Sequence, residues 1–355
     1  MRIILRSRSG LLLFLVFSLV IPVLATAAQR PQDPATVDYH IIKKVTLGGA
    51  GFWDYLGFDP LNNHLFVSHG THVLVLNPDT YKVIGNIPDT MGVHGIAIAP
   101  KLNRGFVSDG GADEVTVFNL KTLKTIRKVK VTGHDPDCIA YDPSSQRVFT
   151  FNGGSDSSTA IDAKTLKVVG TIELGGRPEY AVANGRGMIY NNLTDKNIEL
   201  AINTHDLRIE SRWPMSPCKH PSGLSIDAKH NILFAGCHNG LMTIINGNSG
   251  KVITALPIGL GVDATRFDPE TDLAFSSNGA GTLTVVKEES PTDFKVVQNV
   301  PTERGARTME FDPKTHKVFL VTAKFEAGPP GPRGHRGFLR PRLVPDSFTL
   351  LVLAP

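Results

Sequence analysis

Short apolar segments alternate with polar, turn-forming segments along most of this chain. β-Branched and aromatic residues fill the apolar segments, and Asn, Gly, Asp and Pro separate them, which is the pattern of strands joined by tight turns. Several segments are apolar throughout, and this indicates strands that are buried on both faces. The first two groups predict strands at 56–58, 65–68, 73–77 and 82–87, and then at 96–99, 105–108, 115–119 and 125–131. The chain is therefore predicted to be all-β.

One motif recurs within this pattern: an apolar residue, then Asp-Pro, then a short polar turn. Clear copies lie at 58–60, 141–143, 267–269 and 311–313, and weaker copies lie at 98–100, 182–185 and 226–228. Successive copies are 40 to 44 residues apart, and this period is typical of the blades of a β-propeller. The seven copies predict a seven-bladed β-propeller of four-stranded blades, with the Asp-Pro motif as the turn between the first two strands of each blade.

The two ends of the repeat predict how the ring closes. The last blade, which begins near Phe311, runs out of sequence before its outer strand. The segment Tyr39–Leu47 resembles the outer strands at 123–131 and 166–174, so we expect it to complete blade seven. Closure by an N-terminal strand removes an open sheet edge, and the propeller is predicted to span residues 39–355.

The first residues have the pattern of a targeting segment. Arg2, Arg6 and Arg8 precede an apolar stretch at 11–24, and Ala25-Thr26-Ala27 offers a cleavage site. We expect a signal peptide at 1–27, a flexible N-terminus at 28–38, and a periplasmic or secreted monomer without stable membrane insertion. An uncleaved N-terminal anchor is the alternative, although the apolar stretch is short for a membrane span.

The formal net charge of +4 is concentrated in two places rather than spread over the propeller. One is the N-terminal segment, and the other is a Pro-, Gly- and Arg-rich insertion in blade seven, predicted to be flexible at 325–346. The rest of the chain is close to neutral, which is not typical of a dedicated nucleic-acid-binding protein. The basic residues of the insertion could still contact single-stranded nucleic acid; a solvated loop is the alternative.

Aligning the repeats on their turns identifies a ring of polar residues at the start of the inner strands, where a propeller has one mouth of its central channel. The ring positions are Asp54, His94, Asp137, Glu179, Ser222, Asp263 and Arg307, and Arg177 lies two residues before Glu179. Carboxylates facing one cavity repel one another, and they favour a bound cation or raised pKa values. We interpret the ring as a site for a small polar ligand, a cation such as a metal ion, or a protein partner. A water-filled channel without a ligand is the alternative.

The loops after the second strands are predicted to reach the same mouth. They contribute His69, His72, Asp109, Asn152, Asn191, His238 and Asn278.

Three cysteines, an odd number, allow at most one disulfide within the chain. Cys218 and His220 precede the inner strand of blade five, and Cys237 and His238 follow its second strand, so all four side chains are expected at one corner. In an exported protein Cys218 and Cys237 are candidates for a disulfide, whereas with both imidazoles they would form a zinc or copper site. Cys138 is predicted to be a core thiol.

The second strands carry the signatures by which the chain resembles a known family. Leu65-Phe66-Val67-Ser68, Gly105-Phe106-Val107-Ser108 and Val318-Phe319-Leu320-Val321 occupy the place of the Tyr-Val-Thr-Asn strand, and residues 176–182 resemble the Gly-x-x-Pro start of the preceding inner strand. The chain thus resembles the YncE-like, YVTN-repeat propellers over about residues 39–355. The resemblance implies an exported protein, with surface-layer propellers, a proposed single-stranded DNA binder, reductase propeller domains and lactonase-type propellers among the relatives.

Three functions follow from these observations. The first is a non-catalytic propeller that binds its ligand at the channel mouth. The second is a metal-assisted or lactonase-like hydrolase, or a redox-associated propeller, at the same ring; hydrolysis would need a base among Glu179, His94 and Asp137, and no catalytic residue of the family carries over by motif. The third is single-stranded nucleic-acid binding through the insertion.

Overall fold

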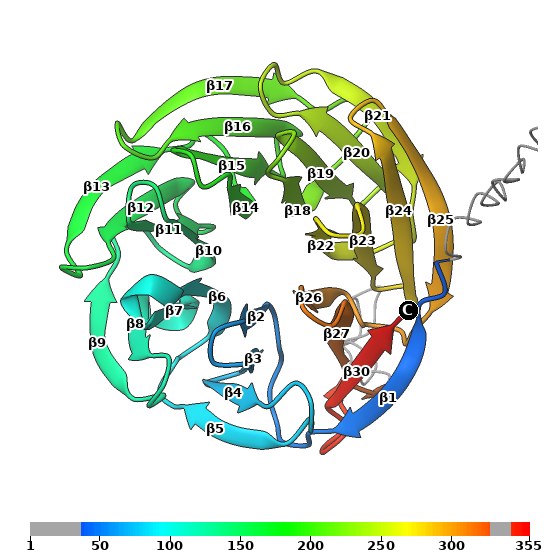
Figure 1. Cartoon of the computed structure of the whole chain (residues 1–355). Helices are drawn as coiled ribbons and strands as arrows, with labels where there is room; N and C mark the ends of the chain where they lie inside the picture. Colours follow the sequence, from blue (N-terminus) through cyan, green and yellow to red (C-terminus); the bar gives the residue numbers. More distant parts are fainter. Residues whose placement is uncertain (1–36, 327–341) are drawn as a thin grey trace, which may run out of the picture. The chain divides into compact units, whose positions relative to one another are not determined.

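The chain folds into a ring of seven antiparallel sheets of four strands each around a central opening (Figure 1). This computed structural model describes residues 37–326 and 342–355. The predicted all-β, seven-bladed β-propeller is confirmed. Within the described residues, no helix is both long enough and apolar enough to cross a membrane.

Each blade runs from an inner strand beside the channel to an outer strand at the rim. The inner strands are β2 (Leu56–Asp59), β6 (Val93–Ala99), β10 (Pro136–Asp142), β14 (Pro178–Ala183), β18 (Pro221–Asp227), β22 (Val262–Asp268) and β26 (Thr308–Asp312). The second strands are β3 (His64–His69), β7 (Arg104–Asp109), β11 (Arg147–Asn152), β15 (Met188–Leu193), β19 (Ile232–Cys237), β23 (Leu273–Asn278) and β27 (Lys317–Thr322). The third strands are β4 (His72–Leu76), β8 (Glu114–Asn119), β12 (Ser157–Asp162), β16 (Ile198–Asn203), β20 (Leu241–Asn246), β24 (Thr282–Ser290) and β30 (Thr349–Ala354). The outer strands are β5 (Val83–Ile87), β9 (Thr125–Lys130), β13 (Val168–Glu173), β17 (Arg208–Pro214), β21 (Val252–Pro257), β25 (Asp293–Pro301) and, in blade seven, β1 (His40–Thr46).

Strand β1 closes the ring, as the sequence predicts. It pairs antiparallel with β30, from His40 opposite Ala354 to Thr46 opposite Thr349. Figure 1 shows this blue strand at the rim, outside the red C-terminal strand. Blade seven is therefore built from both ends of the described chain, and its third strand does not present an open edge.

A buried aromatic residue at the third position of every second strand forms the centre of each blade. These residues are Phe66, Phe106, Phe149, Tyr190, Phe234, Phe275 and Phe319, and none has more than 2% of its surface exposed. The side chain lies between the faces of adjacent sheets, where a large apolar surface is removed from water. This recurring position explains why each unit is stable only beside its neighbours.

The Asp-Pro motifs are structural turns. Asp142 accepts hydrogen bonds from the backbone N–H groups of Ser144 and Ser145, and Asp268 accepts one from Glu270. These carboxylates are buried, and each closes the turn that joins an inner strand to a second strand. The motif therefore contributes to the fold rather than to the channel mouth.

The ends of the predicted insertion at 325–346 are more regular than expected. Strand β28 (Phe325–Glu326) pairs with β29 (Arg342–Leu343), and the backbone N–H of Val344 donates to the carbonyl of Lys324. The remainder, 327–341, lies outside the described residues, as do the predicted signal peptide at 1–27 and residues 28–36 of the predicted flexible N-terminus.

Candidate ligand site at the channel mouth

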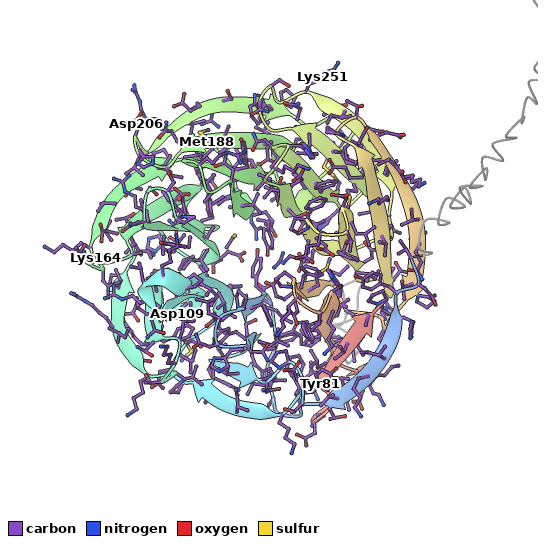
Figure 2. The ribbon with its side chains drawn as sticks, viewed as in Figure 1. Tyr81, Asp109, Lys164, Met188, Asp206 and Lys251 are labelled. Carbon is purple, nitrogen blue, oxygen red and sulfur yellow. A yellow bond between two sulfur atoms is a disulfide. The ribbon has the colours of Figure 1, made fainter. Side chains whose placement is uncertain are left out.

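The ring residues lie at irregular positions of the inner strands. In five blades the pairing between the inner and second strands shifts at the ring position, as between Val93 and Ile96 or between Val262 and Ala264. A β-bulge of this kind redirects a side chain from the regular alternation of a strand. Arg307 directly precedes its strand and Asp54 lies two residues before its own, whereas the other ring residues lie within their strands. Figure 2 shows side chains from the inner strands extending into the central opening.

Polar side chains of the second strands hold the ring residues in place across blade boundaries. Ser108 donates to the carbonyl of Asp137, and Ser277 donates to the carbonyl of Arg307, each in the next blade. Asn192 does the same for Ser222. Since each of these residues bonds the backbone of a ring residue in the neighbouring blade, the ring geometry depends on the blades being packed together.

The ring residues of blades one to three form the tightest group. Nδ1 of His94 lies 2.7 Å from a carboxylate oxygen of Asp54 and 3.7 Å from Oδ1 of Asp137, and Nε2 lies 3.6 Å from Asp135. One donor atom from each of Asp54, His94 and Asp137 lies within 4.8 Å of the other two. Oδ1 of Asp137 is buried and has no hydrogen-bond partner among the described residues.

The environment alters the charges of this group. Burial alone would lower the pKa of His94, but the hydrogen bond with Asp54 and the charges of Asp137 and Asp135 raise it to about 9. Burial and then repulsion from Asp54 raise the pKa of Asp137 to about 7, although His94 opposes this change. His94 is therefore a cation at neutral pH.

Blades five, six and seven supply a second group on the ring. Arg307 lies 3.1 Å from one carboxylate oxygen of Asp263, and the hydroxyl of Ser222 donates to the other at 2.9 Å. Burial raises the pKa of Asp263, and the charge of Arg307 opposes this change. Burial also raises the pKa of Glu179 to about 8, with Asp137 and Asp263 adding to the shift and Arg177 opposing it. The two groups and Glu179 thus share one electrostatic environment.

A pocket of about 410 Å³ lies beside the ring between blades four and five. Arg177, Glu179, Thr194, Asp195, His220 and His238 line it. His220 and His238, predicted as weak metal ligands, therefore line the same pocket as Arg177 and Glu179 of the predicted mouth site.

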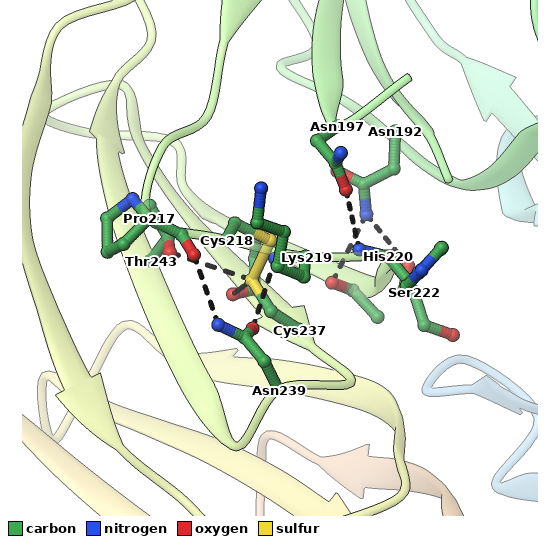
Figure 3. The surroundings of a disulfide bond; sticks show 12 residues. Asn192, Asn197, Pro217, Cys218, Lys219, His220, Ser222, Cys237, Asn239 and Thr243 are labelled. Atoms are coloured by element: carbon green, nitrogen blue, oxygen red, sulfur yellow. Dashed lines mark hydrogen bonds between the residues drawn. A yellow bond between two sulfur atoms is a disulfide. The ribbon is translucent and has the colours of Figure 1, made fainter. Parts of the chain in front are cut away.

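The structure joins Cys218 and Cys237 in a disulfide with their Cα atoms 5.5 Å apart (Figure 3). The side chain of Asn239 fixes the adjoining loop, because it accepts from the backbone N–H of Lys219 and donates to the carbonyl of Pro217. A disulfide has no thiolate, the form of cysteine that binds metals, so this oxidised corner does not form the alternative site of two cysteines and two histidines. Cys138 is free and buried.

Several residues expected at the mouth are instead buried inside the blades. His69 stacks on Phe348 with ring centroids 4.4 Å apart, and burial lowers its pKa to about 4. Asp109 accepts a hydrogen bond from Thr116, and Asn278 donates to Thr284 of the same blade. The repeat alignment located these residues at strand ends correctly, but it did not show that their side chains turn into the sheet.

Four residues that the sequence analysis missed cross the channel further in. Arg266 makes two hydrogen bonds to the carboxylate of Glu310, at 2.8 and 3.1 Å, and its guanidinium lies 5.2 Å from the ring centre of Tyr180. Tyr180 in turn packs on Tyr55 with ring centroids 5.0 Å apart. All four also line a cavity of about 340 Å³ among the inner strands. The repeat alignment contains a signal for these residues. Tyr55 and Tyr180 directly follow the ring residues of their blades, and Arg266 and Glu310 lie three residues after the ring residues of theirs.

The raised pKa of Glu179 predicts a pH effect on stability. Because its folded-state pKa of about 8 lies above the ordinary value of 4.5, the folded protein holds this proton more tightly than the unfolded chain does. The stabilisation is present below the ordinary pKa and is lost as the pH rises toward 8. Between pH 5 and 8, the melting temperature of the wild type should fall more steeply than that of Glu179→Gln. Glu173→Gln, at an exposed position, should keep the wild-type slope; equal slopes for all three proteins would contradict the prediction.

Comparison with known proteins identifies the fold and not a family. No family model matches the chain, and no curated protein matches it. A chain of Kuenenia stuttgartiensis hydrazine synthase is similar with a TM-score of 0.66 and 16% identity, over 78% of this chain and 95% of that one. U3-55K is similar with a TM-score of 0.69 and 10% identity, over 90% of this chain and 99% of that one. Since 1785 chains of solved structures match and these identities are low, the likeness supports the propeller scaffold alone.

Proposed function

We propose that this protein is a binding protein that takes a small cationic ligand at its channel mouth. The observation that carries the proposal is that five carboxyl groups and three cationic groups meet at the mouth, where burial and mutual repulsion oppose full ionisation of the carboxyl groups. The carboxylates are those of Asp54, Asp135, Asp137, Glu179 and Asp263, and the cationic groups are those of His94, Arg177 and Arg307. A ligand with positive charge would favour the ionised carboxylates, because it opposes the repulsion that, after burial, raises the pKa values of Asp137 and Glu179.

The protonation of His94 argues against one of the three candidate bases of the ring. A general base must be unprotonated near the working pH, and an imidazole with a pKa of about 9 is not. The buried, unpartnered oxygen of Asp137 is instead available to accept a hydrogen bond from an ammonium group or to contact a metal ion.

We further propose that the protein works in a periplasmic or extracellular setting. The disulfide between Cys218 and Cys237 supports this, because disulfides persist in oxidising compartments. Membership of the YncE-like, YVTN-repeat propellers fits such a location and is part of the same proposal.

Calorimetric titration of the purified full chain tests the ligand class. One arm uses 1,4-diaminobutane and the other Mn²⁺, and at least one of them should bind the wild type. Asp137→Asn should weaken that binding by about tenfold or more, as loss of one charge-assisted contact requires. Asp206→Asn removes the same charge from an exposed turn at the rim (Figure 2) and should bind as the wild type does.

The two arms distinguish an organic cation from a metal ion. For Mn²⁺, only binding that the wild type shows and Asp137→Asn loses is assigned to the channel mouth. The proposal fails if neither probe binds at millimolar concentration, or if Asp137→Asn binds as tightly as Asp206→Asn.

A further inference from the structure

A second group of charged side chains lies between blades five and six, at the end of the inner strands away from the channel mouth. Asp227 is the last residue of β18, His230 lies in the turn that follows, and Glu288 lies in β24 of the next blade. One donor atom from each of the three lies within 4.8 Å of the other two. This group is separate from the ring, which is at the beginning of the same inner strands.

The repeat shows what is unusual here. The backbone N–H of Glu288 donates to the carbonyl of Asp272, and the same bond is made by Thr204 to Gly187 and by Gly247 to Asn231 in other blades. Glu288 therefore occupies a position that is elsewhere small or uncharged; the equivalent residues are Leu120, Ala163, Thr204 and Gly247.

The pair in blades three and four shows one way in which a polar residue at this position is satisfied. There the hydroxyl of Thr204 donates at 2.7 Å to the turn carboxylate of Asp142 in the preceding blade. Asp227 is the equivalent turn carboxylate, and it faces Glu288 instead of a hydroxyl. Blades three and four thus pair a donor with an acceptor, whereas blades five and six place two carboxylates opposite each other. Two carboxylates repel each other unless a positive charge lies between them.

Glu288 has little else to balance its charge. Its side chain is 3% exposed, and neither carboxylate oxygen has a hydrogen-bond partner among the described residues. Nδ1 of His230 lies 3.4 Å from Oε1 of Glu288, but it is only 2.5 Å from Oδ2 of Asp227, with which it forms its hydrogen bond. A buried carboxylate without a close partner is unfavourable, so the group is incomplete as it stands.

We propose that Asp227, His230 and Glu288 bind a divalent transition-metal ion that links blade five to blade six. One imidazole nitrogen and two carboxylate oxygens are a donor set that suits Zn²⁺. The imidazole is partly exposed, which leaves a route for the ion and room for a water molecule as a further ligand. The hydrogen bond from the backbone N–H of Lys229 to the other oxygen of Asp227 orients that carboxylate.

Zinc titration of chelator-treated protein tests this site. The full chain should bind Zn²⁺, and its melting temperature should rise with the Zn²⁺ concentration. Glu288→Gln should weaken binding at this site by about 100-fold or more, since loss of an outer contact already costs 10- to 100-fold. The neighbouring Glu289→Gln is the matched control, because Glu289 pairs with Lys295 on the surface and should leave zinc binding unchanged.

The outcomes separate this proposal from its main alternative, a proton shared between the two carboxylates. In that case Zn²⁺ would not raise the melting temperature of the wild type, and Glu288→Gln would be at least as stable as the wild type, because the amide can donate to Asp227. The metal-site proposal fails if both of these results are obtained. It also fails if Glu288→Gln and Glu289→Gln bind zinc equally. Asp137→Asn should retain this zinc ion, so the test does not depend on the channel-mouth ligand.

Discussion

Replacing Arg266 with Met should lower the free energy of unfolding by about 3–5 kcal/mol, the usual cost of breaking a buried ion pair. Both partners are mostly buried, with 15% of each side chain exposed. The substitution leaves the carboxylate of Glu310 without its two guanidinium hydrogen bonds, and the backbone N–H of Phe311 remains as its donor. The guanidinium contact with the ring of Tyr180 is also lost. Urea unfolding followed by intrinsic fluorescence measures the change.

The double variant Arg266→Met with Glu310→Leu is the control for this prediction. Because removing both charges leaves no unpaired ion, the double variant should regain most of the stability that the single variant loses. If the single and double variants were equally unstable, the loss would come from packing around Arg266 rather than from the orphaned carboxylate.

Replacing Tyr39 with Ala should cost about 3–5 kcal/mol, as for other large side chains removed from a core. Tyr39 directly precedes β1, and its side chain is 2% exposed. Its ring packs edge-on against Phe275 at 5.0 Å, and its hydroxyl donates to the carbonyl of His316. The backbone of Tyr39 also exchanges two hydrogen bonds with the side chain of Gln298. These contacts hold the closing strand against blades six and seven.

Hydrogen exchange distinguishes the effect on closure from a general loss of stability. In Tyr39→Ala, the amides of residues 40–46 should exchange faster than those of the other outer strands, since the strand has lost its attachment. Tyr39→Phe removes only the hydroxyl and should cost about 1 kcal/mol with little change in exchange. Uniform exchange across all outer strands in Tyr39→Ala would show that the residue does not fasten the ring.

The sequence located some residues of the candidate site correctly and misplaced others. The repeat alignment placed Asp54, His94 and Asp137 at equivalent positions, and they do approach one another in the structure. The same alignment placed His69 and Asp109 at the mouth, yet both are buried in their blades. A repeat specifies how far along a strand a residue lies, whereas the direction of its side chain depends on a bulge or a strand end.

The hydrophobic pattern was sufficient for the number of blades, the turns at the Asp-Pro motifs and the closing strand at residues 39–47. These features follow from local spacing, since strand length, turn residues and a recurring apolar unit are properties of neighbouring positions in the chain. The pairs Arg266–Glu310 and Asp227–Glu288 could not be found in that way, because each joins residues of different blades. Their distances depend on how adjacent sheets pack and where β-bulges redirect side chains. Folding alone brings the partners of each pair together, and with Asp227 and Glu288 it creates the charges on which the proposed metal site depends.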